Sequence, residues 1–164
     1  MPLSIEPGNP RSAEAGALLQ KLDAALSRGY SPDQQHGLSV AELEEDHVHF
    51  FLARLEGEAI GCGAVALFDG FGEVKRMFAE ERARRSGVGK ALVAKFEETA
   101  LAHGRPLLRL ETGIYQDEAL QFYERLGFVR RPPFGAYLEL PPHTIETSIF
   151  YEKALAPADL NGTT

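Results

Sequence analysis

The sequence has no tryptophan, a single cysteine and no long apolar segment. With only Cys62 present, no disulfide can form within the chain, and this cysteine usage is compatible with a reducing compartment. No apolar run approaches the roughly 20 residues that a membrane-spanning helix needs. The opening MPLSIEPGNPRSAEAG lacks the basic, apolar and small-residue succession of an export signal. We therefore expect a cytoplasmic protein that does not bind a membrane.

An excess of positive charge is also missing. The chain has 17 Lys and Arg against 24 Asp and Glu, for a formal net charge of −7, which argues against general binding of nucleic acid. Its 164 residues, 44% hydrophobic and 25% charged, suit one ordinary domain with its own core. We predict a single domain over residues 1–156 and a flexible tail over 157–164.

Hydrophobic periodicity and turn residues divide the chain into strands and helices. Val88, Leu92, Phe96 and Ala100 form an apolar stripe with a helical spacing of four residues. Strand, helix and strand from 73 to 112 form a β-α-β unit, whose two strands should be parallel. The fold class is therefore α/β (α+β), with a mixed, mostly antiparallel sheet around this unit and flanking helices. The predicted elements are helices at 13–28, 39–45, 88–103 and 118–126 (the last capped by Asp117), two strands joined near Gly57, strands at 73–79 and 107–112, and two strands separated by a proline-rich loop after 128.

Positive charge gathers in the segment RARRSGVGKAL, residues 82–92, between a predicted strand and a predicted helix. The first amides of a helix have no partner within the helix and attract anions, and glycines allow an anion to approach the backbone. The segment does not match the dinucleotide fingerprint, which needs glycine at Leu92, nor the P-loop, which needs other residues at Arg84 and Ala91. The alternative is a tight turn with a solvated basic surface.

Two spaced motifs resemble the GNAT N-acetyltransferase superfamily. Arg84-x-x-Gly87-x-Gly89 is similar to its Gln/Arg-x-x-Gly-x-Gly/Ala motif for acetyl-CoA. The segment QDEALQFYERLGFVRR, 116–131, is similar to the family pattern Asn-x-x-Ala-x-x-x-Tyr-x-x-x-Gly-Phe. The resemblance is specific over 73–128, although Gln116 replaces the common asparagine and Glu81 a frequent proline.

This resemblance implies acetyl transfer from acetyl-CoA to an amine of a small molecule or peptide by direct attack. The alternative is an acyl-CoA-binding module that senses the ligand without turnover. Tyr123 takes the position of the proton donor to the leaving thiolate, and the general base is Glu73, Glu111 or a water chain. No nucleic acid partner is implied, and homodimer formation is left open. The implied acetyl-CoA-binding residues are Met77, Phe78, Ala79, Arg84, Arg85, Ser86, Gly87, Val88, Gly89, Lys90 and Gln116.

We expect no metal site. His47 and His49 fall on one face of a strand, but no third ligand lies near them in the sequence, so solvated histidines are the better interpretation. Cys62 stands among small and apolar residues and is interpreted as a packed side chain. Phe134, Tyr137 and His143 lie in the proline-rich loop, which in this family often borders the acceptor; the alternative is surface aromatics.

Overall fold

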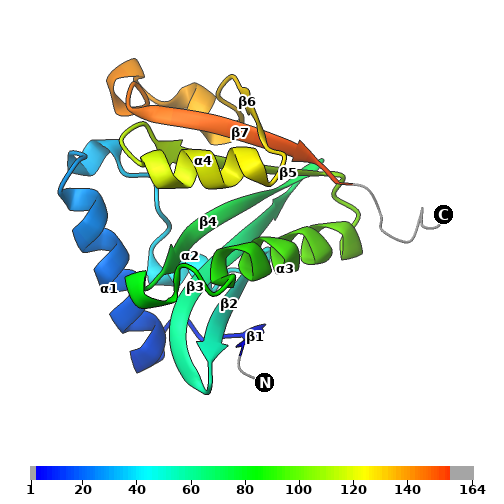
Figure 1. Ribbon diagram of the computed structural model, residues 1–164. Helices are drawn as coiled ribbons and strands as arrows, with labels where there is room; N and C mark the ends of the chain where they lie inside the picture. The colour runs from blue at the N-terminus through cyan, green and yellow to red at the C-terminus, as the bar shows by residue number, and fades with distance from the viewer. Residues whose placement is uncertain (1–2, 156–164) are drawn as a thin grey trace.

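A computed structural model describes residues 3–155, and the predicted tail at 157–164 lies outside this range. Seven strands form one sheet in the order β1-β2-β3-β4-β5-β7-β6 (Figure 1). The strands are β1 (Leu3–Pro7), β2 (Val48–Leu55), β3 (Glu58–Phe68), β4 (Phe71–Ala79), β5 (Leu107–Gly113), β6 (Val129–Arg131) and β7 (Ser148–Ala154). The helices are α1 (Ala13–Ser27), α2 (Val40–Leu43), α3 (Val88–Ala102) and α4 (Asp117–Arg125), with short 3-10 turns η1 (Pro32–Gln34), η2 (Glu81–Ala83), η3 (Gly135–Glu139) and η4 (Pro142–Thr144).

The predicted parallel pair is present, with α3 as the crossover between β4 and β5. All other neighbouring strands are antiparallel, so the predicted mixed sheet is confirmed. β4 and β5 pair only at Phe71 with Leu107, Gly72 with Leu108 and Glu73 with Arg109. Figure 1 shows the two strands meeting at one end and diverging toward α1. The centre of the sheet is therefore split.

Two apolar clusters hold helices on the opposite faces of the sheet. The predicted stripe of α3 packs on one face, where Val88, Leu92, Phe96 and Ala100 have no exposed surface. On the other face, α1 contributes Ala15, Leu18 and Leu19 to a cluster that includes Phe50, Leu52 and Cys62. Successive side chains of β2 point to opposite faces of the sheet. Phe51 and Ala53 therefore belong to the first cluster, and Phe50 and Leu52 to the second.

A third cluster lies under the proline-rich loop. Phe134 and Tyr137 are 3% and 6% exposed and pack edge-to-face with Phe150 of β7. The interpretation of these two as surface aromatics is therefore wrong. Contacts with the sheet, which local sequence does not reveal, give this loop its own small core.

Two details of the predicted elements also differ. The prediction that Asp117 caps the last helix is wrong, because α4 begins at Asp117 and its N-cap is Gln116, whose side chain makes no capping bond. Asp117 and Glu118 instead lie in the first turn, where negative charge favours the helix dipole. Strand β1 was not predicted.

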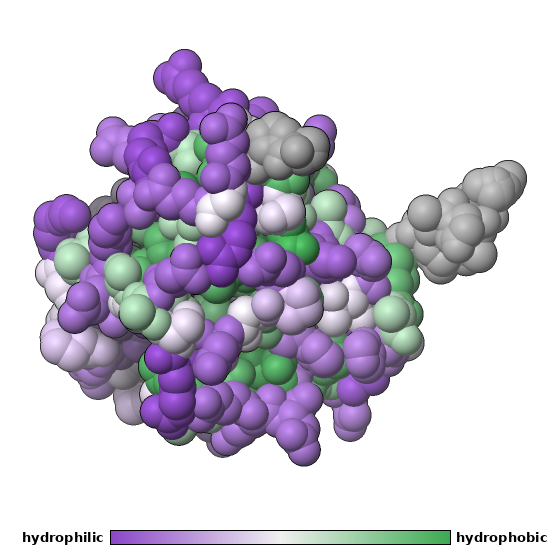
Figure 2. All heavy atoms as spheres, turned by 90° about the horizontal axis from the view of Figure 1, so that it is seen from below, coloured by the Kyte–Doolittle hydropathy of each residue, from purple (hydrophilic) through white to green (hydrophobic). Residues whose placement is uncertain are grey.

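The surface is mostly polar, as the charged fraction implies. Seen from below, hydrophilic residues surround small hydrophobic areas (Figure 2). Within residues 3–155, no helix combines the length and apolar character required to cross a membrane; the longest, α1 and α3, have 15 residues each.

Candidate active site

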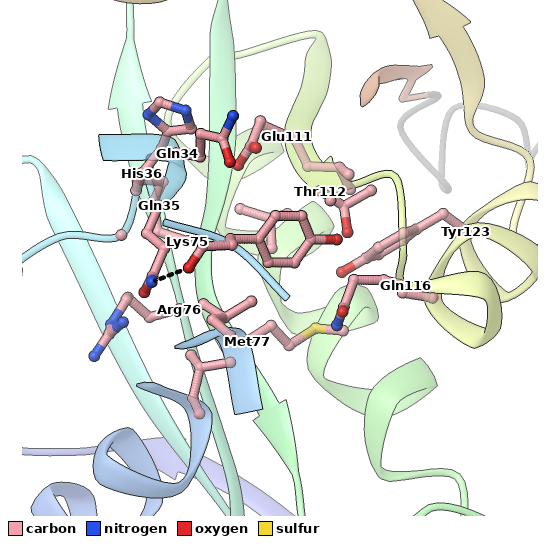
Figure 3. Close-up of a pocket in the computed structure, with 18 residues that line it drawn as sticks. Gln34, Gln35, His36, Lys75, Arg76, Met77, Glu111, Thr112, Gln116 and Tyr123 are labelled. Atoms are coloured by element: carbon pink, nitrogen blue, oxygen red, sulfur yellow. Dashed lines mark hydrogen bonds between the residues drawn. The ribbon is translucent and has the colours of Figure 1, made fainter. Parts of the chain in front are cut away.

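A pocket of about 150 Å³ lies where β4 and β5 part. Tyr123 enters it from α4, and Gln35 and His36 come from the loop after α1 (Figure 3). The floor consists of residues of the two parted strands. The full lining is Leu22, Leu26, Tyr30, Gln34, Gln35, His36, Gly37, Val74, Lys75, Arg76, Met77, Leu110, Glu111, Thr112, Gly113, Gln116, Ala119 and Tyr123.

Glu111 brings a carboxylate to this pocket from β5. Its Oε2 accepts a hydrogen bond of 2.6 Å from the Ser148 hydroxyl of β7. Burial raises the pKa of Glu111, and the nearby negative charge of Glu73 acts in the same direction; the bond from Ser148 and the positive field of His36 and Lys75 only partly oppose this. Such a carboxylate is a stronger base than an exposed one.

Tyr123 lines the same pocket and is 7% exposed. Its ring packs against Phe122, Phe128 and Tyr151. Burial raises its pKa above the ordinary value, and the charge of Glu111 adds to this, so the phenol keeps its proton. Tyr123 therefore brings a protonated hydroxyl to the pocket.

Glu73 is not among the residues that line the pocket. Its Oε2 accepts a 2.7 Å hydrogen bond from the Tyr137 hydroxyl and lies 3.3 Å from Lys75 Nζ. The side chains of Glu73 and Lys75 are 8% and 10% exposed. Of the two predicted carboxylates, only Glu111 opens on the pocket, whereas Glu73 is held in a buried ion pair.

Sequence reasoning missed Lys75 and His36 as site residues. Lys75 Nζ donates to the His36 backbone oxygen at 2.9 Å, and His36 Nε2 donates to the Thr144 carbonyl oxygen at 2.7 Å. One signal was available, because residues two apart on a strand face the same way, which places Lys75 beside Glu73. No local pattern indicates the partners in the two loops.

Tyr30 closes the pocket at the end of α1. Its hydroxyl accepts a 2.9 Å hydrogen bond from the Tyr115 backbone amide, and its ring lies over Gly113, where an added Cβ would overlap the phenol. Gly113 is therefore required for this wall.

Among the predicted acetyl-CoA-binding residues, Met77 and Gln116 line the pocket, whereas Phe78 and Ala79 lie outside it. The edge of β4 from Val74 to Ala79 that faces β5 has no strand partner within residues 3–155. Arg76 within it has a left-handed φ of 54°, which accompanies a shift in register against β3. Unpaired backbone groups are therefore available along this edge.

The glycine loop lies outside the pocket and forms the start of α3. Gly87 is the N-cap with φ 83°, a left-handed conformation that suits glycine, and no side chain caps the helix. The first intrahelical bond runs from Ala91 to Gly87, so the amides of Val88, Gly89 and Lys90 have no partner in the helix.

Some side chains of the loop make hydrogen bonds within the protein, and others are exposed to solvent. Arg84 Nε donates to the Ala79 oxygen and Ser86 donates to the Ala83 oxygen, whereas Arg85 and Lys90 are exposed. The Val88 side chain is wholly buried, so only its backbone can meet a ligand. Packing also favours glycine at position 89, because an added Cβ would lie 3.0 Å from the Phe122 ring.

The remaining candidates lie away from this chemistry. The His49 ring packs against that of His103 at 4.9 Å, and within residues 3–155 no group of three or more His, Cys, Asp or Glu could hold a metal ion. Cys62 is fully buried, and burial raises its pKa to about 12, so its thiol is a packed side chain.

Comparisons with known proteins agree with this geometry. The sequence profile of the Acetyltransferase (GNAT) family matches residues 19–128. The IAA acetyltransferase of Azospirillum brasilense is 39% identical over 140 residues, which cover 84% of this chain and 88% of that protein. YsnE of Bacillus subtilis, an uncharacterized N-acetyltransferase, is 33% identical over 127 residues, or 76% of this chain and 81% of that one.

Solved structures show the same fold. A Klebsiella pneumoniae structure described as an acyl-CoA N-acyltransferase has a TM-score of 0.79 at 34% identity and covers 94% of this chain and 98% of its own. A GNAT family acetyltransferase of Elizabethkingia anophelis with acetyl-CoA bound has a TM-score of 0.63 at 19% identity, with coverage of 93% and 98%, and supports the fold alone. The chain described here belongs to the GNAT acetyltransferase family and is an acyltransferase.

Proposed function

We propose that this protein transfers the acetyl group of acetyl-CoA to an amine of a small molecule or peptide by direct attack, within a single catalytic domain at residues 1–156. One observation carries the proposal: a half-buried carboxylate, Glu111, and a buried phenol, Tyr123, line one pocket where the sheet splits. Acetyl-CoA as the donor is supported by the match of residues 19–128 to the Acetyltransferase (GNAT) family.

The split sheet and the start of α3 fit the two ends of acetyl-CoA. The pantetheine arm contains amides and can add to the unpaired edge of β4 like a further strand, beside Met77, Phe78 and Ala79. The pyrophosphate suits the free amides after Gly87, with exposed Arg85 and Lys90 nearby to offset its charge. Gln116, at the start of α4, faces the pocket between these regions.

Attack by the amine requires the removal of protons. An alkyl amine has a pKa of about 10, so the ammonium form first loses one proton to solvent. Its nitrogen then bonds to the thioester carbonyl carbon, and Glu111 accepts the second proton. As the carbon–sulfur bond breaks, Tyr123 donates a proton to the thiolate and later regains one through solvent from Glu111.

Release of free thiol from acetyl-CoA tests the proposal. A panel of primary amines, lysine peptides and IAA, the compound named in the Azospirillum brasilense relative, should contain at least one acceptor. Glu111→Gln keeps the shape of the side chain and removes the base, so turnover should fall by about 10²- to 10⁴-fold. Gln121→Glu, on exposed α4 surface, is the control and should retain activity. Full activity in Glu111→Gln would contradict the assigned base.

A further inference from the structure

Lys75 is the centre of a closed polar cluster beside the pocket. Its ammonium donates to the His36 backbone oxygen at 2.9 Å, the Tyr137 hydroxyl at 3.1 Å and Glu73 Oε2 at 3.3 Å. The Tyr137 hydroxyl itself donates to Glu73 Oε2 at 2.7 Å. All three N–H donors of the lysine therefore have a protein partner, and none remains for a substrate.

The cluster joins three segments that are distant in the sequence. Lys75 belongs to β4, His36 to the loop after η1, and Tyr137 to η3 in the proline-rich loop. The loop residues 34–37 line the pocket, and His36 also binds the Thr144 oxygen of η4. Loss of the Lys75 ammonium would therefore remove the hydrogen bond that ties this wall of the pocket to β4.

Stability alone does not account for this arrangement. Taking two charges out of water costs about as much free energy as their attraction returns, so a buried ion pair adds little net stability. The pair has a second neighbour, however, because Lys75 of β4 and Glu111 of β5 line the same pocket. Lys75 favours the ionised form of that carboxylate and Glu73 disfavours it.

We propose that Lys75 is a positioning residue, which holds the 34–37 wall in place and, with Glu73 as its opposite charge, sets the electrostatic environment of the Glu111 carboxylate. The inference rests on the proposed function, in which Glu111 is the base. The groups that face or influence Glu111 are Tyr30 after α1, His36 in the following loop, Glu73 and Lys75 of β4, Tyr123 of α4, Tyr137 of η3 and Ser148 of β7.

Two substitutions of similar shape should act in opposite directions. Lys75→Met removes the positive charge, so the Glu111 carboxyl should titrate at higher pH than in the wild type. Glu73→Gln removes the negative charge, so it should titrate at lower pH. Each shift should be about half a pH unit or more. A ¹³C NMR titration of the side-chain carboxyls measures both, and the resonance that Glu111→Gln removes identifies Glu111.

A double variant guards against misfolding. Lys75→Met alone leaves the Glu73 carboxylate buried without its partner, whereas Lys75→Met with Glu73→Gln leaves no charge in the pair. The double variant should titrate between the two single variants. If Lys75→Met does not fold, Glu73→Gln and the double variant decide the matter, because Glu73→Gln must still lie at the lower pH of the two.

Titrations that coincide with the wild type, or that move in the same direction in both single variants, would overturn the inference. If Lys75 had only a structural role, each variant would have a lower melting temperature. The pH at which Glu111 titrates would then not follow the charge that was removed. The proposed base fails separately, if Glu111→Gln retains turnover while the titrations still separate by charge.

Discussion

Burial has different chemical consequences for the two side chains proposed to move protons. Tyr123 and Glu111 both have raised pKa values, because each is withdrawn from water at the same pocket. For the phenol, the shift preserves the proton that a leaving thiolate needs. For the carboxyl, it strengthens the base but places an expensive charge inside the fold.

Tyr123→Phe separates chemistry from packing. The phenylalanine keeps the ring contacts with Phe122 and Phe128 and deletes only the hydroxyl. We expect turnover to fall by about 10²- to 10⁴-fold with the affinity for acetyl-CoA unchanged, as measured by steady-state kinetics and calorimetry. Tyr151→Phe is the matched control: its hydroxyl bonds to Glu124 outside the pocket, so its loss should affect stability. Near-full activity in Tyr123→Phe would assign the proton to water.

Glu111→Gln should stabilise the fold at neutral pH. The pKa of Glu111 is higher in the folded than in the unfolded state, so stability falls as pH rises from the ordinary carboxyl value through the folded one. Removing the carboxyl removes this loss, and the melting temperature should rise by about 2–4 °C for each kcal/mol regained. Below about pH 4 the difference should vanish, which thermal denaturation across pH will check.

Glu152→Gln provides a control of the opposite sign. Burial raises the pKa of Glu152, but hydrogen bonds from Arg131 and Arg109 outweigh it, and the net pKa is lowered. Stability from such a group is present above the ordinary carboxyl pKa, so this variant should lose stability at neutral pH. If both Glu111→Gln and Glu152→Gln lost stability at neutral pH, the charge of Glu111 would not destabilise the folded state.

Among the helices and strands, the first turn of α3 is the proposed pyrophosphate site, which can be tested by adding a negative charge. Gly87→Asp suits the left-handed position better than most residues and would place a carboxylate at the free amides, in competition with pyrophosphate. The affinity for CoA should fall at least tenfold, or about 1.4 kcal/mol. Gly87→Asn has the same shape without the charge and should lose less, as isothermal calorimetry will show. Equal losses would attribute the effect to shape.

Elements with strong periodicity could be predicted from the sequence, and those that depend on distant partners could not. The stripe of α3 and the glycines at its start determine the β-α-β unit locally. Strand β1 has only five residues, at the edge of the sheet, and although Leu3 and Ile5 alternate with Ser4 and Glu6, so short a pattern does not distinguish a strand from a loop. Tyr137 and Lys75 meet across 62 positions, so their contact depends on tertiary folding alone. Tyr123 was predicted through the family motif and Glu111 as a carboxylate at the end of a strand, but their shared pocket depends on tertiary folding.

For the whole molecule, the choice of ligand should appear as a change in stability. A ligand that binds only the folded state raises the unfolding free energy by about 2.7 kcal/mol at a concentration of 100 times Kd. We expect acetyl-CoA to raise the melting temperature, and NAD and ATP at equal concentration to leave it unchanged. A larger rise with either nucleotide would contradict the proposed donor. Gly87→Asp should reduce the rise with acetyl-CoA.

The split in the sheet leaves a narrow joint between its two parts. Three residue pairs join β4 to β5, so few backbone hydrogen bonds connect strands β1–β4 to strands β5–β7, although one apolar cluster under α3 includes residues of both parts. A pantetheine arm along β4 would lie in the gap between β4 and β5 and would connect the two parts of the sheet. The molecule should then be most rigid while the acetyl donor is bound, and amide exchange in β5 and β7 should quicken when CoA departs. Loss of the product and loosening of the joint would be one event, which readies the gap for the next donor.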